Sequence, residues 1–319
     1  MSQTSVLRSN DSRELVEDWI LNLRKPCIIR DCAVGECLTK WKPDYMASTV
    51  GHKPVSVHES SSNRLRFLKK NFTYVVLPFA EFIQKASCFS RAGCGDCAGD
   101  DCDRRYYYYR AVADDVRNTP SDFRRDFPSL SPDFTVPSFL QPEKIFSCVL
   151  RCSSADLGLW LHYDVLDNVL VQVRGRKRAI LFNPEDAEYL YLSGDKSLIH
   201  DPENVDLEEF PLFVKARPYV YQLEPGDVLF IPAFWLHYMI SEDFSVAVNI
   251  FWYNLPRELY DQKDTYGNKE LQPYFRAAQG VDRALKQLEG LPIDIQRFYM
   301  RMLRSKIDKA LGLSRDRSA

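Results

Sequence analysis

Residues 159–173, LWLHYDVLDNVLVQV, carry the two patterns on which the fold and the chemistry depend. His162 and Asp164 lie two positions apart, and the apolar run NVLVQV follows directly at 168–173. Along an extended segment, residues i and i+2 point to the same side, so the imidazole and the carboxylate would project together. The stretch therefore predicts a pair of metal ligands where a β-strand meets the interior of a barrel.

Short strand patterns surround this stretch on both sides, and turn signals such as RGRK at 174–177 and EPGD at 224–227 separate them. Many short strands with few helices between them are typical of an antiparallel double-sheet barrel or jelly roll. We therefore expect a mainly β fold with some α-helix, built as a double-stranded β-helix barrel. The predicted strands are 25–32, 54–60, 72–78, 106–112, 145–153, 168–173, 178–184, 219–223, 227–232 and 245–253.

Helical patterns lie at the two ends of the chain. Apolar residues at fourfold spacing predict a short helix that ends near Leu23, and from about Gln272 the apolar residues repeat with a period of 3.6. We expect a barrel domain over residues 1–271 and a helical hairpin over residues 272–319. The apolar stripes of the hairpin must pack on the barrel or on a second copy of the chain, so a homodimer through these helices is one of two alternatives.

The composition, with 45% apolar and 27% charged residues, excludes wholesale disorder and a fibrous class. No apolar run reaches the roughly 18 residues that a membrane helix needs, so we expect no membrane partner. The first fifteen residues show no signal-peptide pattern, and an odd number of cysteines, nine, suits reduced thiols better than a disulfide framework. We expect an intracellular protein, cytoplasmic or nuclear.

Four cysteines lie close together in residues 88–103, CFSRAGCGDCAGDDCD. Cys94 and Cys97 form a CxxC pair, so these residues together with Cys88 and Cys102 could bind zinc. The outer spacings are irregular, and the glycine and aspartate content is that of a solvated insertion. The favoured interpretation is a surface loop.

His237, in the stretch IPAFWLHYMI, is the candidate for a third ligand beside His162 and Asp164. Two imidazoles and one carboxylate on one face of an iron ion form the facial triad of non-haem Fe(II) oxygenases, which leaves positions open for substrate chemistry. Alternatively, each histidine could be an ordinary core residue that is satisfied by a hydrogen bond.

Lys177 is the candidate cation for a 2-oxo acid that would chelate such an iron, because the far carboxylate of that acid needs a positive partner. Lys177, Ala179 and Leu181 share one face of a predicted strand, and a lysine in a barrel interior is costly unless it is paired. Alternatively, Lys177 belongs to an exposed basic cluster with Arg174, Arg176 and Arg178.

Three segments together resemble the JmjC-type (cupin-like) iron(II)/2-oxoglutarate oxygenases: LWLHYDVLDNVLVQVRGRKRAILFNP, LEPGDVLFIPAFWLHYMI and VAVNIFWY. The resemblance implies that Fe(II) is bound by His162, Asp164 and His237, and that 2-oxoglutarate and dioxygen are co-substrates. It further implies that the far carboxylate of 2-oxoglutarate is held by Lys177 and Tyr108, with Asn168 assisting and Asn249 lining the same pocket. Tyr108 is chosen within the run of four tyrosines at 106–109 because of the arginine that follows the run.

Within this family the chain is most similar to the branch that hydroxylates the wybutosine-type side chain of the modified guanosine beside the anticodon of tRNA-Phe. That similarity covers most of the chain, from KPCIIRD and KWKPDYM through FLKKNFTYVVLPF to LPRELYDQKDTYGNKE and the RAAQGVDRALKQL helix. It implies a tRNA partner, whose phosphates would need cationic contacts. The candidates are Arg64, Arg66, Lys69 and Lys70 in NRLRFLKKNF, and Arg297, Arg301, Arg304, Lys306 and Lys309 on the last helix.

Other interpretations of the same residues stay open. The basic positions could be ordinary solvated faces without any nucleic acid. The chief alternative function is a protein side-chain hydroxylase of the same fold, which would share the iron and 2-oxoglutarate but not the response to tRNA. A catalytically silent binding module is disfavoured by the complete set of His162, Asp164, His237 and Lys177.

Overall fold

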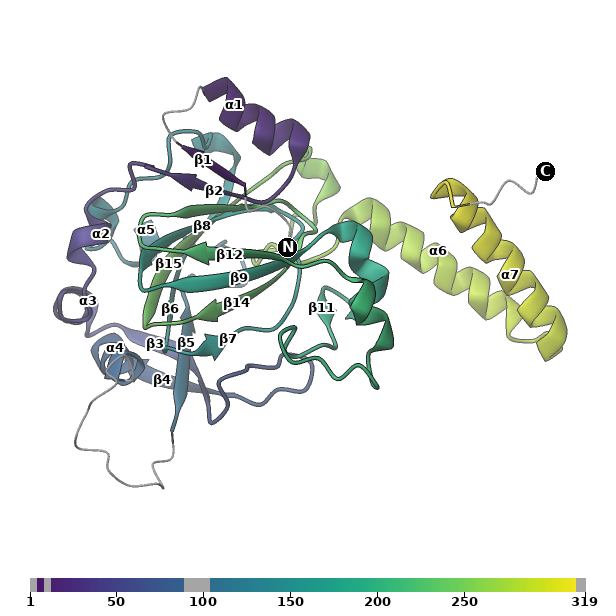
Figure 1. The fold of residues 1–319 in the computed structure, drawn as a ribbon, viewed down its shortest axis with the longest axis horizontal. Helices are drawn as coiled ribbons and strands as arrows, with labels where there is room; N and C mark the ends of the chain where they lie inside the picture. The colour runs from purple at the N-terminus through teal and green to yellow at the C-terminus, as the bar shows by residue number, and fades with distance from the viewer. Residues whose placement is uncertain (1–4, 9–12, 89–103, 314–319) are drawn as a thin grey trace. The chain divides into compact units, whose positions relative to one another are not determined.

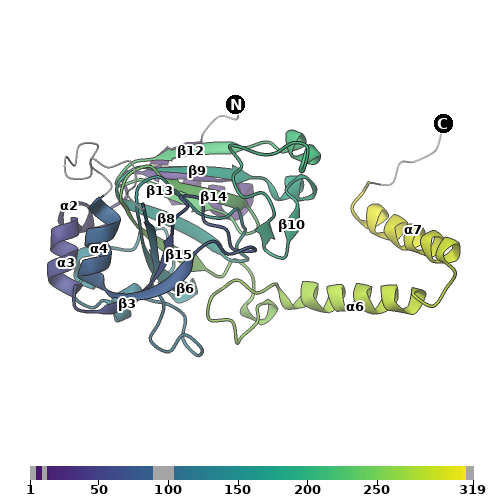
Figure 2. The ribbon, with the colours of Figure 1, turned by 90° about the horizontal axis from the view of Figure 1, so that it is seen from below.

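Two β-sheets face each other and form the framework of the fold (Figures 1 and 2). The structure is a computed structural model and describes residues 5–8, 13–88 and 104–313. In these ranges the larger sheet has, in order of pairing, β1 (Val6–Arg8), β2 (Cys27–Arg30), β13 (Val228–Ile231), β8 (Asp167–Arg174), β15 (Ser245–Trp252), β6 (Ile145–Ser153), β5 (Tyr106–Arg110), β3 (Pro54–Ser60) and β4 (Thr73–Pro78). The smaller sheet has β12 (Tyr219–Leu223), β9 (Lys177–Phe182), β14 (Leu236–Ser241) and β7 (Leu157–Gly158), and β10 (Leu192–Ser193) pairs with β11 (Lys196–Ser197).

The larger sheet separates two apolar cores. Val169, Val171 and Val173 of β8 belong to the core on its outer side, whereas Leu170 belongs to the core between the two sheets. Successive side chains of a strand point to opposite faces, and a strand that is covered on both faces is an unbroken apolar run. The run NVLVQV is apolar on both faces for this reason. The predicted mainly β, double-sheet fold is confirmed, and each predicted strand is present with slightly different ends.

Helices cover the outer face of the larger sheet (Figure 1). Met46 and Val50 of α3 and Phe79 and Phe82 of α4 are buried there against the strands. The predicted first helix is present as α1, and its last part is a π-helical turn, η1. The helices of this part are α1 (Arg13–Asp18), η1 (Trp19–Leu23), α2 (Cys37–Lys40), α3 (Pro43–Val50), α4 (Phe79–Ser87), α5 (Phe123–Asp126), and the 3-10 turns η3 (Ser131–Asp133), η4 (Pro142–Lys144), η5 (Pro184–Tyr189), η6 (Pro211–Lys215) and η7 (Arg257–Leu259).

The alternation of side chains also places polar groups inside the barrel. In the register of β9 and β14, Lys177 lies opposite Ser241, and Leu181 lies opposite His237. Ala179 and Leu181 belong to the core between the sheets, and Lys177 shares their face and is buried. The predicted inward orientation of Lys177 is confirmed, and the alternative of an exposed basic cluster is wrong for this residue.

An ion pair with a buried carboxylate fixes the start of β8 beside the predicted metal ligands. The Arg24 guanidinium donates to both carboxylate oxygens of Asp167, at 2.9 and 2.6 Å. The backbone N–H of Ala233, in the turn between β13 and β14, donates to Asp167 Oδ1 at 2.9 Å. The Asp167 carboxylate therefore connects the start of β8, which follows His162 and Asp164, with the turn that precedes His237.

The C-terminal helices form a second unit, made of residues 258–261 and 270–319. α6 (Gln272–Leu288) and α7 (Ile293–Ala310) contact each other as the predicted helical hairpin, and neither helix contains a buried residue. The predicted domain boundary after residue 271 stays a prediction. Among the helices of the described ranges, none has both the length and the apolar character to span a membrane.

The possible zinc site in the cysteine-rich segment cannot be placed. Of its four cysteines, only Cys88 lies in the described part of the chain, where it is exposed. The other three lie outside the described residues.

Candidate metal centre

The backbone of the two predicted histidine ligands is paired directly. His162 lies between β7 and β8 and is not part of a continuous strand, contrary to the simple extended segment that the sequence indicated. Instead, it forms an isolated antiparallel bridge with His237 of β14, with N–H···O distances of 3.2 and 2.8 Å between the two residues. The carbonyl of Asp164 accepts from the N–H of Phe234, which holds the segment from its other end. The extended geometry at His162 is thus imposed by its partner.

This pairing brings the three predicted ligands together. One candidate ligand atom from each of His162, Asp164 and His237 lies within 4.8 Å of the other two. The Asp164 carboxylate oxygen Oδ2 is 3.5 Å from His237 Nε2, and the centres of the two imidazole rings are 4.3 Å apart. A single ion can therefore contact all three side chains without a rearrangement of the backbone.

A hydrogen bond to a backbone carbonyl orients each of the two imidazoles. His162 Nδ1 lies 2.9 Å from the carbonyl of Trp160, and His237 Nδ1 lies 3.0 Å from the carbonyl of Trp235. A carbonyl can only accept, so Nδ1 carries the proton in each ring and Nε2 keeps a free electron pair. Such carbonyl partners are typical of histidines that bind metals through the other nitrogen.

The electrostatics of the centre suit a divalent cation. Burial lowers the pKa of His162 well below its ordinary value, and the neighbouring His237 lowers it further. Burial also lowers the pKa of His237, against the opposing effect of Asp164. Asp164 Oδ2 is buried and has no hydrogen-bond partner. Neutral imidazoles beside an unsatisfied carboxylate oxygen have the donor set of the iron triad, so these residues fit the Fe(II) ion that the sequence predicts.

A cluster of buried polar side chains lies deeper in the barrel, around Lys177. Tyr108 Oη accepts a 2.5 Å hydrogen bond from Arg151, and the hydroxyls of Ser153 and Ser241 are 2.7 Å apart. Ser153 lies opposite Tyr108, and Ser241 lies opposite Lys177. Within the described ranges no carboxylate lies at ion-pair distance from Lys177. A cation that is buried with hydroxyls and without a counter-ion is suited to an incoming carboxylate.

The two predicted asparagines are neighbours on the inner face of the larger sheet. Asn249 Nδ2 donates to Asn168 Oδ1 at 3.1 Å, and both side chains are buried. Asn249 Oδ1 has no hydrogen-bond partner. The pair therefore retains an acceptor for a ligand inside the barrel.

A cavity of about 450 Å³ opens onto this centre. Of the predicted site residues, His162, Asp164 and Tyr108 line it, whereas His237 and Lys177 lie behind its wall in the barrel interior. A volume of this size is typical of a pocket for a small ligand or for one nucleobase. The remaining wall consists largely of aromatic and cationic side chains, including Phe67, Tyr74, Trp160, Arg110, Arg151 and Lys196.

The arginines and serines of this site were not predicted from the sequence. Arg151 and Ser153 stand two positions apart in the otherwise apolar strand IFSCVLRCS, as Tyr108 and Arg110 do in YYYYR. One pattern in the sequence could have indicated them. A charged residue interrupts an apolar strand, on the same face as a predicted ligand. Arg110 is half-buried, and burial together with the nearby Arg151 lowers its pKa.

The comparisons with known proteins agree with this geometry. Residues 13–258 match the cupin-like domain family, and this range contains every predicted ligand and 2-oxoglutarate contact. The chain is 46% identical to tRNA wybutosine-synthesizing protein 5 of Gallus gallus over 90% of this chain and 88% of that protein. For the proteins of the same name the identity is 44% in Mus musculus, over 94% of each chain, and 45% in Homo sapiens, over 92% of this chain and 91% of that protein.

Proposed function

Since this chain belongs to the cupin-like domain family and to the family of tRNA wybutosine-synthesizing protein 5, we propose that it is an Fe(II)/2-oxoglutarate-dependent tRNA hydroxylase. Its proposed substrate is the wybutosine-precursor side chain of the modified guanosine beside the anticodon of tRNA-Phe. The observation that carries the proposal is the convergence of His162, Asp164 and His237 beside a cavity that His162 and Asp164 line, in a chain whose relatives are named for wybutosine synthesis.

In this proposal His162, Asp164 and His237 hold the iron through two nitrogens and one carboxylate oxygen. When bound, iron and 2-oxoglutarate supply the activation of dioxygen that lets one oxygen atom enter a C–H bond of the substrate. The carbonyls of Trp160 and Trp235 keep both imidazoles in the tautomer that can bind the metal.

Lys177 and Tyr108 bind the far carboxylate of 2-oxoglutarate in the proposed complex, and Asn168 and Asn249 contact the same molecule. Lys177 offers the charge, and the Tyr108 hydroxyl, held by Arg151, offers a donor. The apolar lining between the sheets excludes water from this end of the barrel, which strengthens each of these interactions.

A tRNA partner also requires contacts to phosphates. Arg66, Lys69 and Lys70 are exposed on one segment of the first unit, and the predicted basic residues of α7 are exposed as well. We propose these side chains as phosphate contacts. Because tRNA is an intracellular molecule, an intracellular location is part of the same proposal.

The test is the release of succinate by the purified protein with Fe(II) and 2-oxoglutarate. We expect release to be stimulated by tRNA-Phe that carries the unhydroxylated precursor, to fall steeply as salt is raised, and to be accompanied by the gain of one oxygen atom in the tRNA. The same tRNA without the modification is the control. Stimulation by peptides alone would instead support the protein side-chain hydroxylase and contradict the proposed substrate.

We also propose a homodimer that forms through the C-terminal helices. Neither α6 nor α7 contains a buried residue, yet each has apolar side chains along its length, such as Phe275 and Phe298. Phe298→Glu is expected to convert a dimer to a monomer in light-scattering measurements of mass, because a charge cannot be buried unpaired in an apolar interface. Glu289→Ala, an exposed change next to the hairpin turn, is the control. A wild-type monomer at micromolar concentration would contradict the dimer.

A further inference from the structure

The segment between β3 and β4, residues 61–72, contributes Phe67 to the lining of the cavity at the candidate metal centre. Its backbone is paired with β7, because the N–H of Gly158 donates to the carbonyl of Asn63 at 2.7 Å and the N–H of Leu65 donates to the carbonyl of Gly158 at 2.9 Å. β7 leads directly toward His162. Residues 61–72 are therefore held by β7, the strand that leads to the predicted ligand His162.

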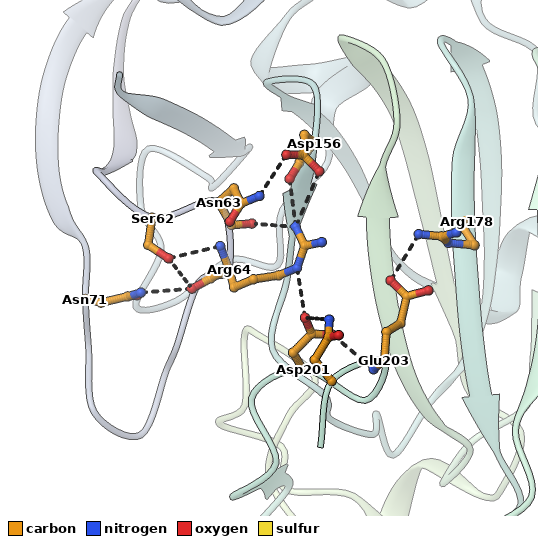
Figure 3. A network of polar contacts seen from close by, with 9 residues as sticks. Ser62, Asn63, Arg64, Asn71, Asp156, Arg178, Asp201 and Glu203 are labelled. Carbon is orange, nitrogen blue, oxygen red and sulfur yellow. Dashed lines mark hydrogen bonds and ion pairs between the residues drawn. The ribbon is translucent and has the colours of Figure 1, made fainter. Parts of the chain in front are cut away.

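Arg64 adds a second attachment by its side chain (Figure 3). Its guanidinium donates to the carbonyl of Asp156 at 2.9 Å and to the carboxylate of Asp201 at 3.3 Å, and Asn71 donates to the carbonyl of Arg64 at 2.8 Å. Arg64 was predicted as a phosphate contact, but two acidic residues and a carbonyl already engage its guanidinium. Its place in the fold is that of a positioning residue, which ties residues 61–72 to the two loops that contain Asp156 and Asp201.

The fixed segment brings aromatic side chains next to the metal ligands. The rings of Phe67 and Trp160 have centres 5.0 Å apart, and the Trp160 ring is stacked on Phe72 at 6.0 Å. The centre of the Trp160 ring is 6.1 Å from that of His162. Phe67 and Trp160 are only half-buried and both line the cavity. A π-surface thus extends from the cavity mouth to the first ligand.

The exposed cation Lys70 lies beside this π-surface. Lys70 Nζ lies 5.2 Å from the centre of the Phe67 ring and 5.6 Å from that of Tyr74, and the side chain of Lys70 is exposed. Lys196 Nζ lies 4.3 Å from the Phe67 ring, but it is neutralised by Asp195 at 2.6 Å. Aromatic surfaces with exposed cations at their edge are the usual means by which proteins hold unpaired nucleotides, with bases on the rings and phosphates on the cations.

We propose that Phe67 and Trp160 form a stacking site for the modified guanine base after it has left the stack of the anticodon loop, with Lys70 at the adjoining phosphate. This inference rests on the proposed function and deepens it. An enzyme that acts on a base must take that base out of its stack, and RNA bases outside a helix are commonly held by aromatic side chains. A base against Trp160 would place its side chain beside His162 and Asp164, where the oxidation must occur.

The test is the binding of two anticodon stem–loops of tRNA-Phe, one with the modified guanosine and one with plain guanosine, to the full-length protein without iron. Phe67→Leu is expected to weaken binding of the modified stem–loop about tenfold or more, because a stacked ring is lost, and to weaken binding of the plain one less, because its smaller base has less surface to stack. Phe67→Tyr is expected to keep the wild-type preference. Leu68→Ala is the matched control, since Leu68 is exposed on the same segment and does not line the cavity.

Two results would distinguish failure of the stacking site from failure of the proposed substrate. Full preference for the modified stem–loop in Phe67→Leu would overturn the stacking site alone. Equal binding of both stem–loops by the wild type would overturn the proposed substrate and the stacking site together. Unchanged melting temperatures of the variants exclude unfolding as the cause.

Tryptophan fluorescence gives a second readout. Stacking of the base on Trp160 is expected to quench emission of the wild type when the modified stem–loop binds, and Trp160→Phe is expected to bind it with most of that quenching removed. Quenching of the same size in Trp160→Phe would contradict contact between the base and Trp160.

Discussion

Asp164→Ala is expected to abolish hydroxylation and to leave the metal-free fold intact. Loss of a residue that only orients a ligand costs about 10- to 100-fold in metal affinity or activity, so loss of the ligand itself should cost at least about 100-fold. The two remaining imidazoles cannot complete the facial triad. Succinate release and titration with a divalent metal measure the two effects.

The structure also predicts how this variant changes stability. Asp164 Oδ2 is buried without a hydrogen-bond partner, and an unsatisfied buried polar group costs about 1–3 kcal/mol. Removal of the carboxylate should therefore leave the melting temperature of the metal-free protein unchanged or raise it. Asp243→Ala is the control, since Asp243 pairs on the surface with Arg176. Wild-type activity or metal affinity in Asp164→Ala would contradict the assignment of the ligand.

Lys177→Met is expected to weaken the binding of 2-oxoglutarate about 100-fold or more, because the far carboxylate would be buried without its cationic partner. Calorimetry with Mn(II) in place of iron measures this affinity without oxidation of the metal. Lys215→Met, which removes an exposed lysine outside the cavity, is the control. An unchanged dissociation constant in Lys177→Met would remove Lys177 from the proposed site.

The binding of 2-oxoglutarate is also expected to depend on pH, because of Lys177. Burial in the barrel, together with the charge of Arg151, lowers the pKa of Lys177 from 10.5 to about 7. Above that pH the free protein holds a neutral amine, and 2-oxoglutarate needs the ammonium form, so binding should take up a proton and weaken as pH rises above about 7. Calorimetry in buffers of different ionisation enthalpy should detect this proton uptake in the wild type and not in Lys177→Met.

Stability of the ligand-free protein should follow the same lowered pKa. Between pH 10.5 and about 7 the unfolded chain binds a proton at Lys177 that the folded chain does not, so the free energy of unfolding falls as pH falls through this window. Below about pH 7 both states are protonated and this contribution is constant. Lys177→Met should lack the dependence, and chemical denaturation across the window measures it.

Much of the site could be predicted from the sequence, because residue type and period are local properties. His162 and Asp164 stand at the spacing that places two side chains on one face, and Lys177 stands in phase with Ala179 and Leu181. In the structure, the register of β9 with β14 places the Lys177 side chain on the same face as those of Ala179 and Leu181. In contrast, His162 is not in a regular strand, and its geometry comes from the backbone bridge to His237. The prediction of a shared face survived because that bridge supplies the extended conformation.

Arg64 and Arg151 show what the sequence could not indicate. Both are arginines in plausible contexts, one in a basic segment and one in an apolar strand. Arg64 is engaged by Asp156 and Asp201, whereas Arg151 is directed to Tyr108 inside the barrel. The sequence shows that Arg151 interrupts an apolar strand, but the partners of both arginines lie far away in the sequence, so it does not show which groups either arginine contacts.

By itself, the sequence determined the mainly β fold, through its short apolar runs and turns, and it named the two histidines and the carboxylate that the structure brings together as a candidate metal site. Only the tertiary structure decided which side chains meet: Arg151 with Tyr108, Ser153 with Ser241, and Phe67 with Trp160. The reason is that alternation along a strand depends on neighbouring residues alone, whereas contact across the barrel depends on the register between strands that are distant in the chain.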